Sequence, residues 1–207
     1  MGVEKMHCEL VSWERFHALT RQLALAIHRA PFRPELIVAI GRGGYLPARI
    51  VSDYLDVYDL ASIRIEHYRG VRRERAARVR YPLTADVAGK RVLLIDDVSD
   101  SGETFAVAIR HLQAHGEPAA LRTAVLHHKS VSVYTPDFYA ALVAEWRWII
   151  YPWAVMEDLR SFLHGMDPPP TSVEAFARRL REQHGIEPGL QALSDAFAMP
   201  AIGYRDD

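Results

Sequence analysis

A short apolar run that ends in acidic residues constrains the fold and function of this chain more than any other feature. Residues 92–95 are apolar throughout, as expected for a strand buried in the centre of a parallel sheet. Asp96 and Asp97 follow directly, and Asp100 comes three residues later. Because open α/β sheets bind their ligands at the carboxyl ends of their strands, these carboxylates are the first candidates for a binding site.

The residues that follow the carboxylates suit the binding of a phosphate. Residues 101–104, Ser-Gly-Glu-Thr, lead into a helix that we expect to end at about His115. Hydroxyl groups, a glycine and free N–H groups at the start of a helix form a receptor for a phosphate. The adjacent carboxylates suit a ribose diol or a bound metal ion. The segment 91–104 therefore offers groups for a phosphate, a sugar and a metal.

This segment resembles the phosphoribosyl-diphosphate-binding motif of the type I phosphoribosyltransferases, which is an apolar strand, two acidic residues and then Asp-x-Gly-x-Thr. The resemblance covers roughly residues 12–160 and is closest to the 6-oxopurine branch, whose members use hypoxanthine, guanine or xanthine. It implies transfer of the 5-phosphoribosyl group of phosphoribosyl diphosphate to a purine base, with release of pyrophosphate, in purine salvage. It also implies Mg²⁺ as the cofactor and a homodimer or higher homo-oligomer.

On this resemblance, Asp100 accepts the proton from the purine and is a catalytic residue. Asp96 and Asp97 hold the ribose and, through the ribose and water, the Mg²⁺. The residues expected to bind the diphosphate substrate here are Asp96, Asp97, Val98, Ser99, Asp100, Ser101, Gly102, Glu103 (through its backbone) and Thr104.

A glycine-rich loop follows a second apolar run, at residues 36–40. It contains Gly41, Arg42, Gly43 and Gly44, and its glycines let backbone N–H groups approach an anion closely. These residues alone are equally compatible with a plain turn between a strand and a helix. Together with the acidic segment, the loop resembles the pyrophosphate loop of the same family. The resemblance implies substrate binding by all four residues, a catalytic role for Arg42 and a cis peptide bond between Gly41 and Arg42.

Two later segments are candidates for a base-binding site. Lys129 ends one expected strand, and Trp148 and Ile149 begin another. A lysine can donate to a carbonyl oxygen and a tryptophan can stack on a heterocycle, although the aromatic segment is equally compatible with core packing. The three residues resemble the base-binding elements of the 6-oxopurine branch. This implies that a catalytic Lys129 contacts the exocyclic oxygen, that Trp148 covers the purine and that the main chain of Ile149 contacts the base.

The base-binding segment departs from the family pattern at two positions. Related bacterial xanthine–guanine enzymes carry acidic residues where this chain has Ile150 and Ala154. This difference puts the preferred base in doubt. Glu157 and Asp158 lie nearby in the sequence and are candidates to compensate for the missing carboxylates.

Residues 69–81 are rich in arginine and show no periodicity, so we expect a long mobile loop there. Three interpretations of this loop stay open: a solvated loop, a lid that closes over the diphosphate as the family resemblance implies, and a nucleic-acid-binding surface. The arginines are Arg69, Arg72, Arg73, Arg75, Arg78 and Arg80.

Strands that alternate with helices predict an α/β fold with a doubly wound, mainly parallel sheet and helices on both faces. The family resemblance adds a small hood. After the stiff Asp167-Pro-Pro-Pro170 segment, Thr171 and Glu174 form an apparent capping box that opens a helix. We therefore expect a phosphoribosyltransferase domain at residues 1–167 and a helical C-terminal appendage at residues 168–207.

Composition narrows the classes of function that remain. A net charge of −1 gives no general attraction to nucleic acid or to an anionic membrane. The single cysteine, Cys8, excludes an internal disulfide and fits a cytoplasmic location, and we expect no membrane span. Two alternatives stay open, a nucleic-acid-binding regulator that retains the diphosphate site and a phosphoribosyltransferase for another base.

Overall fold

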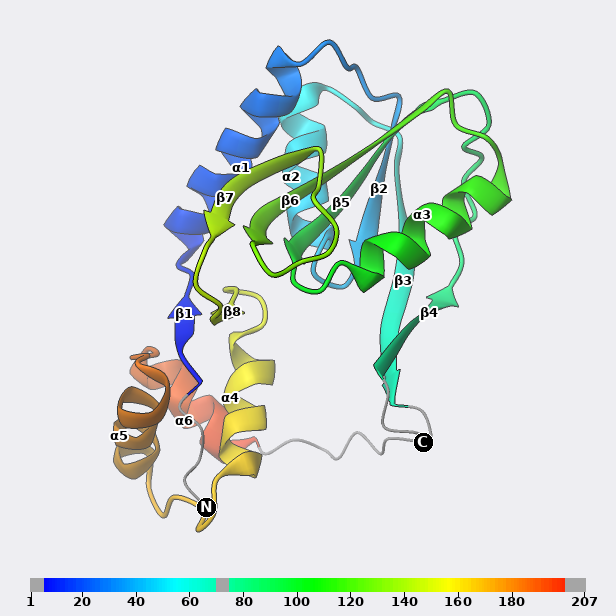
Figure 1. Ribbon diagram of the computed structural model, residues 1–207. Helices are drawn as coiled ribbons and strands as arrows, with labels where there is room; N and C mark the ends of the chain where they lie inside the picture. The colour runs from blue at the N-terminus through cyan, green and yellow to red at the C-terminus, as the bar shows by residue number, and fades with distance from the viewer. Residues whose placement is uncertain (1–5, 70–74, 200–207) are drawn as a thin grey trace. The chain divides into compact units, whose positions relative to one another are not determined.

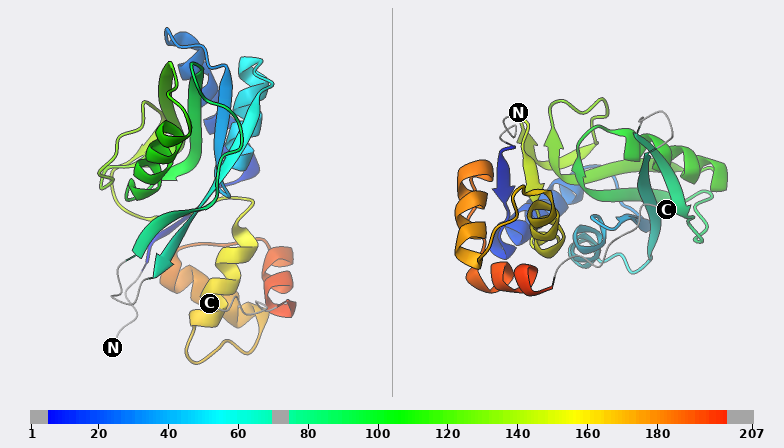
Figure 2. Two further views of the ribbon diagram at one scale, coloured as in Figure 1. Left: turned by 90° about the vertical axis from the view of Figure 1, so that its right-hand side faces the viewer. Right: turned by 90° about the horizontal axis from the view of Figure 1, so that it is seen from below.

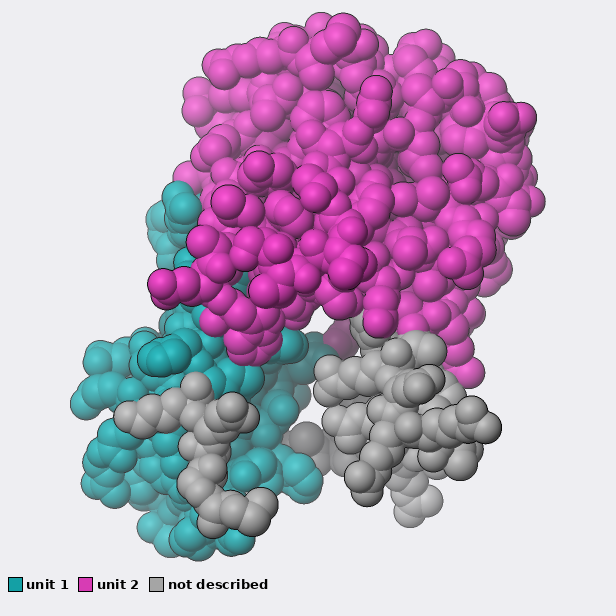
Figure 3. All heavy atoms as spheres, in the orientation of Figure 1, with its two compact units in different colours: residues 1–16, 147–207 teal, residues 17–146 magenta. Residues whose placement is uncertain are grey.

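The computed structural model of the chain describes residues 6–69 and 75–199 (Figure 1). The chain forms two compact units, which Figure 3 shows in different colours. Unit 1 consists of residues 1–16 and 147–207, and unit 2 consists of residues 17–146. Within the described ranges, no helix combines the length and the apolar character needed to cross a membrane.

A six-stranded sheet forms the centre of unit 2, counted over the described residues, with the strand order β4-β3-β2-β5-β6-β7. The β3–β4 pair is antiparallel and the other neighbouring pairs are parallel. The strands are β2 (Leu36–Gly41), β3 (Leu60–Arg69), β4 (Arg75–Tyr81), β5 (Arg91–Ser99), β6 (Ala120–Lys129) and β7 (Phe138–Val143).

Helices cover both faces of this sheet (Figure 2). Helix α3 (Glu103–His115) lies on one face, and α1 (Trp13–Arg29) and α2 (Tyr45–Leu55) lie on the other. Ser12 caps α1 as a helix-capping hydroxyl should, because its Oγ accepts a hydrogen bond of 3.1 Å from the N–H of Arg15. The predicted doubly wound α/β fold is confirmed.

The central strands are apolar because both of their faces are covered. All of β2 is buried, and so are residues 92–96 of β5. The core on the α3 face combines side chains from β2 and β5 with Phe105, Ala108 and Leu112 of α3. Such continuous apolar runs are typical of parallel strands buried on both sides.

The site region follows from the connections of β2 and β5. These two strands are parallel neighbours in the sheet, with Leu36 opposite Val92 and Ala39 opposite Ile95. From β2 the chain crosses to β3 on one side, whereas from β5 it crosses to β6 on the other side. A sheet binds ligands where its connections diverge in this way. The loops after β2 and β5 therefore flank the expected binding crevice.

The prediction of a long mobile loop at residues 69–81 is wrong for residues 75–81, which form β4. Ala77 and Val79 pack against the core of unit 2, whereas Arg78 and Arg80 form ion pairs of 2.8 and 3.0 Å with Glu66 of β3. The alternation of small or apolar residues with arginines is that of a half-buried strand. Residues 70–74 lie outside the described residues, so the interpretations of that segment stay predictions.

Unit 1 contains strands and helices from both ends of the chain. Strand β1 (Cys8–Leu10) pairs in parallel with β8 (Trp148–Ile150). Three helices follow β8, namely α4 (Val155–Gly165), α5 (Val173–His184) and α6 (Leu190–Ala198). One apolar core joins Ile150 and Leu159 to Phe176 and Leu193. Strand β1 and helix α4 were not expected from the sequence. The boundary between residues 167 and 168 stays a prediction.

Helix α5 begins one residue later than expected. Its capping residue is Ser172, not Thr171, because the Ser172 side chain accepts a hydrogen bond of 3.2 Å from the N–H of Ala175. A hydroxyl that caps a helix satisfies an N–H group that has no partner inside the helix.

We expect Ser172→Ala to lower the free energy of unfolding by about 1 kcal/mol, because it removes this cap. Thr171→Ala is the matched control and should change it by less than about 0.5 kcal/mol, since Thr171 is exposed. Urea unfolding of both variants measures the difference. Equal losses would contradict the assignment of the cap.

Candidate active site

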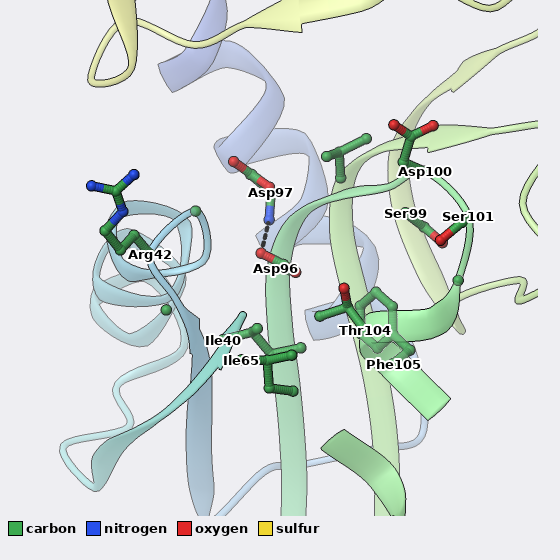
Figure 4. A pocket seen from close by; sticks show the side chains of 14 residues that line it. Ile40, Arg42, Ile65, Asp96, Asp97, Ser99, Asp100, Ser101, Thr104 and Phe105 are labelled. Carbon is green, nitrogen blue, oxygen red and sulfur yellow. Dashed lines mark hydrogen bonds between the residues drawn. The ribbon is translucent and has the colours of Figure 1, made fainter. Parts of the chain in front are cut away.

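A cavity of about 280 Å³ opens at the carboxyl ends of β2 and β5 (Figure 4). In Figure 4, Asp96 and Asp97 lie between the loop that carries Arg42 and the loop that carries Ser99 to Thr104. The lining residues are Ile40, Gly41, Arg42, Gly43, Ile65, Asp96, Asp97, Val98, Ser99, Asp100, Ser101, Gly102, Thr104 and Phe105. The structure thus brings together most of the residues that the sequence assigned to the diphosphate.

The two adjacent carboxylates differ in their surroundings. Asp96 is buried, and its Oδ1 accepts a hydrogen bond of 2.9 Å from the N–H of Asp97. Burial, together with the charge of Asp97, raises the pKa of Asp96 well above its usual range. A cation or hydroxyl donor that enters the cavity would favour the ionised form of Asp96. Such a pair is suited to a ligand that brings its own donors or positive charge.

The glycine loop after β2 packs closely on its surroundings. A side chain at Gly43 would overlap the carboxylate of Asp97, and one at Gly44 would overlap the carbonyl oxygen of Ile95. The peptide bond between Gly41 and Arg42 is cis, as the family resemblance implied. Gly44 does not line the cavity, and its N–H donates to the carbonyl of Ile40 at 2.8 Å. The packing therefore requires glycine at position 44, where an added Cβ would overlap backbone atoms.

The loop after β5 is supported by a segment that was not expected to contribute. Ser99 Oγ lies 2.8 Å from Ser132 Oγ, and the Phe105 ring stacks on Tyr134 with centroids 5.1 Å apart. Gly102 has a φ of 92°, which favours glycine, and a Cβ there would lie 2.7 Å from Tyr134 Cβ. The structure therefore requires glycine at position 102 for two independent reasons.

The residues expected to cradle a phosphate lie at the start of α3. Ser101 and Thr104 line the cavity, whereas Glu103 does not. The backbone N–H of Glu103 faces Ser101 Oγ at 3.4 Å, which is a long contact for a hydrogen bond. The arrangement keeps hydroxyl groups and the first turn of a helix together beside Asp96 and Asp97.

Asp100, which follows β5, contacts Lys129, which ends β6. Both are expected catalytic residues. Lys129 is only 2% exposed, and its Nζ lies 3.1 Å from Asp100 Oδ2. Trp146, which sequence reasoning missed, donates from its Nε1 to Asp100 Oδ1 at 3.1 Å. Its ring centroid lies 4.4 Å from Lys129 Nζ. These three residues, called the Asp100 cluster below, follow or end the neighbouring strands β5, β6 and β7.

Four other missed residues near the site are apolar or aromatic. Ile40, Ile65 and Phe105 line the cavity. Tyr134 lies next to Gly102, which also lines it. In the sequence, these residues carry only the signal of ordinary core packing. Their place at the site depends on which strands become neighbours.

Trp148 and Ile149 belong to strand β8 of unit 1. The Trp148 Nε1 donates a hydrogen bond of 2.9 Å to Asp158 Oδ1, and Ile149 is buried. Burial, with a smaller contribution from the charge of Glu157, raises the pKa of Asp158 from 3.8 to about 6. Asp158 is therefore a partner of the tryptophan that was expected to cover the base.

The comparison with protein families matches residues 8–158 to the phosphoribosyl transferase domain. The chain belongs to the phosphoribosyltransferase family. The family resemblance inferred from residues 91–104 is thereby confirmed. A domain of this kind implies a transferase enzyme.

Three relatives are between 24% and 32% identical to this phosphoribosyltransferase over the residues that align. It is 32% identical over 143 residues to the xanthine-guanine phosphoribosyltransferase of Idiomarina loihiensis, which covers 69% of this chain and 84% of that protein. The crystal structure of a purine phosphoribosyltransferase from Pyrococcus horikoshii superimposes with a TM-score of 0.63 at 29% identity, over 72% of this chain and 94% of that chain. A xanthine-guanine-hypoxanthine phosphoribosyltransferase from Helicobacter pylori has the same TM-score at 24% identity, covers 75% of this chain and 99% of that chain, and supports the fold.

We expect Gly102→Ala to destabilise this phosphoribosyltransferase by about 2 kcal/mol more than Gly89→Ala does. Both glycines have a positive φ, so both substitutions meet the same kind of backbone penalty. Only Gly102 also faces Tyr134, whereas a Cβ at Gly89 would meet nothing within 4 Å. Urea unfolding measures both losses. Equal losses would show that Tyr134 does not restrict position 102.

We expect the ionisation of Asp158 to lower the free energy of unfolding as the pH rises from about 4 to about 7. The folded-state pKa of about 6 lies above the ordinary 3.8. Protonated Asp158 therefore adds to the free energy of unfolding, by at most about 3 kcal/mol. This contribution is fully present below pH 3.8 and is lost as the pH rises through 6.

The variant Asp158→Asn should flatten this pH dependence and keep an acceptor for Trp148. Glu182→Gln, at an exposed position on α5, is the control and should follow the wild type. Free energies of unfolding measured across this pH range test the expectation. An unchanged slope in Asp158→Asn would argue against a raised pKa at that residue.

Proposed function

We propose that this enzyme transfers the 5-phosphoribosyl group of phosphoribosyl diphosphate to a 6-oxopurine base, giving the nucleoside monophosphate and pyrophosphate, as in purine salvage. The observation that carries the proposal is the single cavity shared by the glycine loop, the carboxylates of β5 and the start of α3. The purine and xanthine-guanine enzymes among the relatives support the choice of base.

Each part of the diphosphate substrate has a matching group in the cavity. The hydroxyls and the first turn of α3, at residues 101–104, would bind the 5′-phosphate. Asp96 and Asp97 would accept hydrogen bonds from the ribose hydroxyls. Residues 41–43 of the glycine loop, with the charge of Arg42, would bind the pyrophosphate group.

The chemistry requires a leaving group, a nucleophile and a proton acceptor. The bond between the anomeric carbon and the pyrophosphate oxygen breaks, and its electron pair leaves with pyrophosphate. A purine imidazole nitrogen forms the new bond to that carbon, and its proton passes to Asp100. Lys129 would donate to the exocyclic oxygen of the base, while Trp148 would stack on the ring and the main chain of Ile149 would contact it.

The residues present fit the Mg²⁺ that the family implies. Mg²⁺ prefers hard oxygen ligands and keeps several waters, and Asp96 and Asp97 offer carboxylate oxygens in the cavity. Within the part of the chain that the structure describes, no group of three acidic, histidine or cysteine side chains forms a site of its own. The ion would therefore be held with the ribose and the diphosphate, and it would supply charge neutralisation of the pyrophosphate. Asp96 and Asp97 would hold the sugar and, through it and water, the ion.

The ion pairs on the β3–β4 ribbon favour the enzyme over the nucleic-acid-binding regulator. Arg78 and Arg80 are both paired with Glu66, which reduces the positive charge available to a phosphate backbone. A cytoplasmic location and a homodimer or higher homo-oligomer stay predictions.

We expect the wild-type enzyme to release pyrophosphate with hypoxanthine, guanine or xanthine and to discriminate against adenine by about 10⁴-fold. Lys129 can donate a hydrogen bond to the exocyclic oxygen of a 6-oxopurine, whereas adenine has an amino group at that position and offers the lysine no acceptor. Lys129→Ala should lose most activity on all three 6-oxopurines. Lys90→Ala is the control, because Lys90 pairs with Asp59 on the surface, and it should behave like the wild type.

The measurement is pyrophosphate release with phosphoribosyl diphosphate, Mg²⁺ and a panel of bases that includes uracil and orotate. Efficient use of adenine would remove the proposed role of Lys129. Turnover with only a pyrimidine would replace the proposed substrate, and no turnover with any base would favour a regulator.

A further inference from the structure

Trp146 is an aromatic residue at the site for which neither the cavity nor the sequence pattern assigned a role. It lies in the segment between β7 and β8 and is about half exposed. Its indole contacts both polar members of the Asp100 cluster. A tryptophan that only filled space would not need its N–H aimed at a carboxylate and its ring beside an ammonium group.

The contacts divide the two oxygens of Asp100 between two partners. Oδ1 accepts from the Trp146 N–H at 3.1 Å, and Oδ2 faces Lys129 Nζ at 3.1 Å. An indole N–H is a neutral donor that does not titrate. It therefore holds the carboxylate in one orientation and leaves its negative charge in place.

The same ring restrains Lys129. The ammonium group lies 4.4 Å from the ring centroid, within the range of a cation–π interaction, which strengthens as water is excluded. Lys129 is nearly inaccessible to water. The Trp146 side chain therefore orients two groups. Its indole N–H holds Asp100, the proposed proton acceptor, and its ring holds Lys129, the proposed base-binding residue.

We propose that Trp146 is a positioning residue for the transfer reaction, acting through Asp100 and Lys129. This inference rests on the proposed function. When Lys129 turns to the carbonyl oxygen of a base, Asp100 loses its ion pair, and the Trp146 N–H still holds one carboxylate oxygen. The other oxygen then faces the purine and receives its proton. Without Trp146, the carboxylate would rotate freely at the moment when its orientation matters most.

Two substitutions distinguish the hydrogen bond from the indole N–H to Asp100 from the contact of the ring with Lys129. Trp146→Phe removes the N–H and retains a ring beside Lys129, so we expect kcat to fall about tenfold, as for the loss of a hydrogen bond to a charged group. The KM for the base should change little. Trp146→Leu removes the ring as well, so the KM for the base should also rise about fivefold.

The control is Trp13→Phe, the same change at another half-exposed tryptophan that has no part in the Asp100 cluster. It should retain wild-type kcat and KM. Calorimetric titration with phosphoribosyl diphosphate and Mg²⁺ should give the same affinity for Trp146→Phe and for the wild type, which shows that the variant is folded.

A double-mutant cycle tests whether Trp146 acts through Asp100. In an Asp100→Asn background there is no proton acceptor left to orient, so adding Trp146→Phe should lower kcat by less than twofold. A full tenfold loss in that background would overturn the inference, and so would an unchanged kcat in Trp146→Phe alone. If the wild type transferred to no purine, the proposed function would fail instead. A wild type that is slowed by Asp100→Asn, but not by Trp146→Phe, would refute only the role of Trp146.

Discussion

The parallel pairing of β2 with β5 is the constraint on which the rest of the site depends. It joins two strands whose connections leave in opposite directions, so the glycine loop and the acidic loop emerge side by side. Both strands are buried on two faces, which fixes their register through apolar packing. The carboxyl group of Asp96 is buried as a consequence, and this burial raises its pKa.

The parts of the site that could be predicted are those that are continuous in the sequence. Asp96, Asp97 and Asp100 stand on one strand and its loop, so their order alone indicates a binding edge. The glycine loop and Lys129 could be predicted for the same reason, because each directly follows or ends an apolar run. The family resemblance then supplied a common role for segments that are far apart in the chain.

Residues that act through long-range contacts could not be predicted in this way. Tyr134 matters because it lies against Gly102. Trp146 matters because it follows β7 and contacts Asp100, which follows β5, with β6 between these two strands. Neither has a local pattern that distinguishes it from a core aromatic. The error at β4 has another cause, because the many arginines hide the alternation of a half-buried strand. Arg78 and Arg80 belong to a strand because both pair with Glu66 of β3. Strand β1 is too short to be predicted without β8 beside it.

The pairing of β1 with β8 has a consequence for the order in which the protein assembles. Unit 2 is one continuous stretch of chain, whereas unit 1 is built from two stretches separated by the whole of unit 2. During synthesis, the residues of unit 2 leave the ribosome before those of β8, so they are available to fold first. Strand β1 is made first but must wait for a partner. The entropy of closing such a long loop grows only slowly with its length, and a folded unit 2 shortens the flexible path between the two strands.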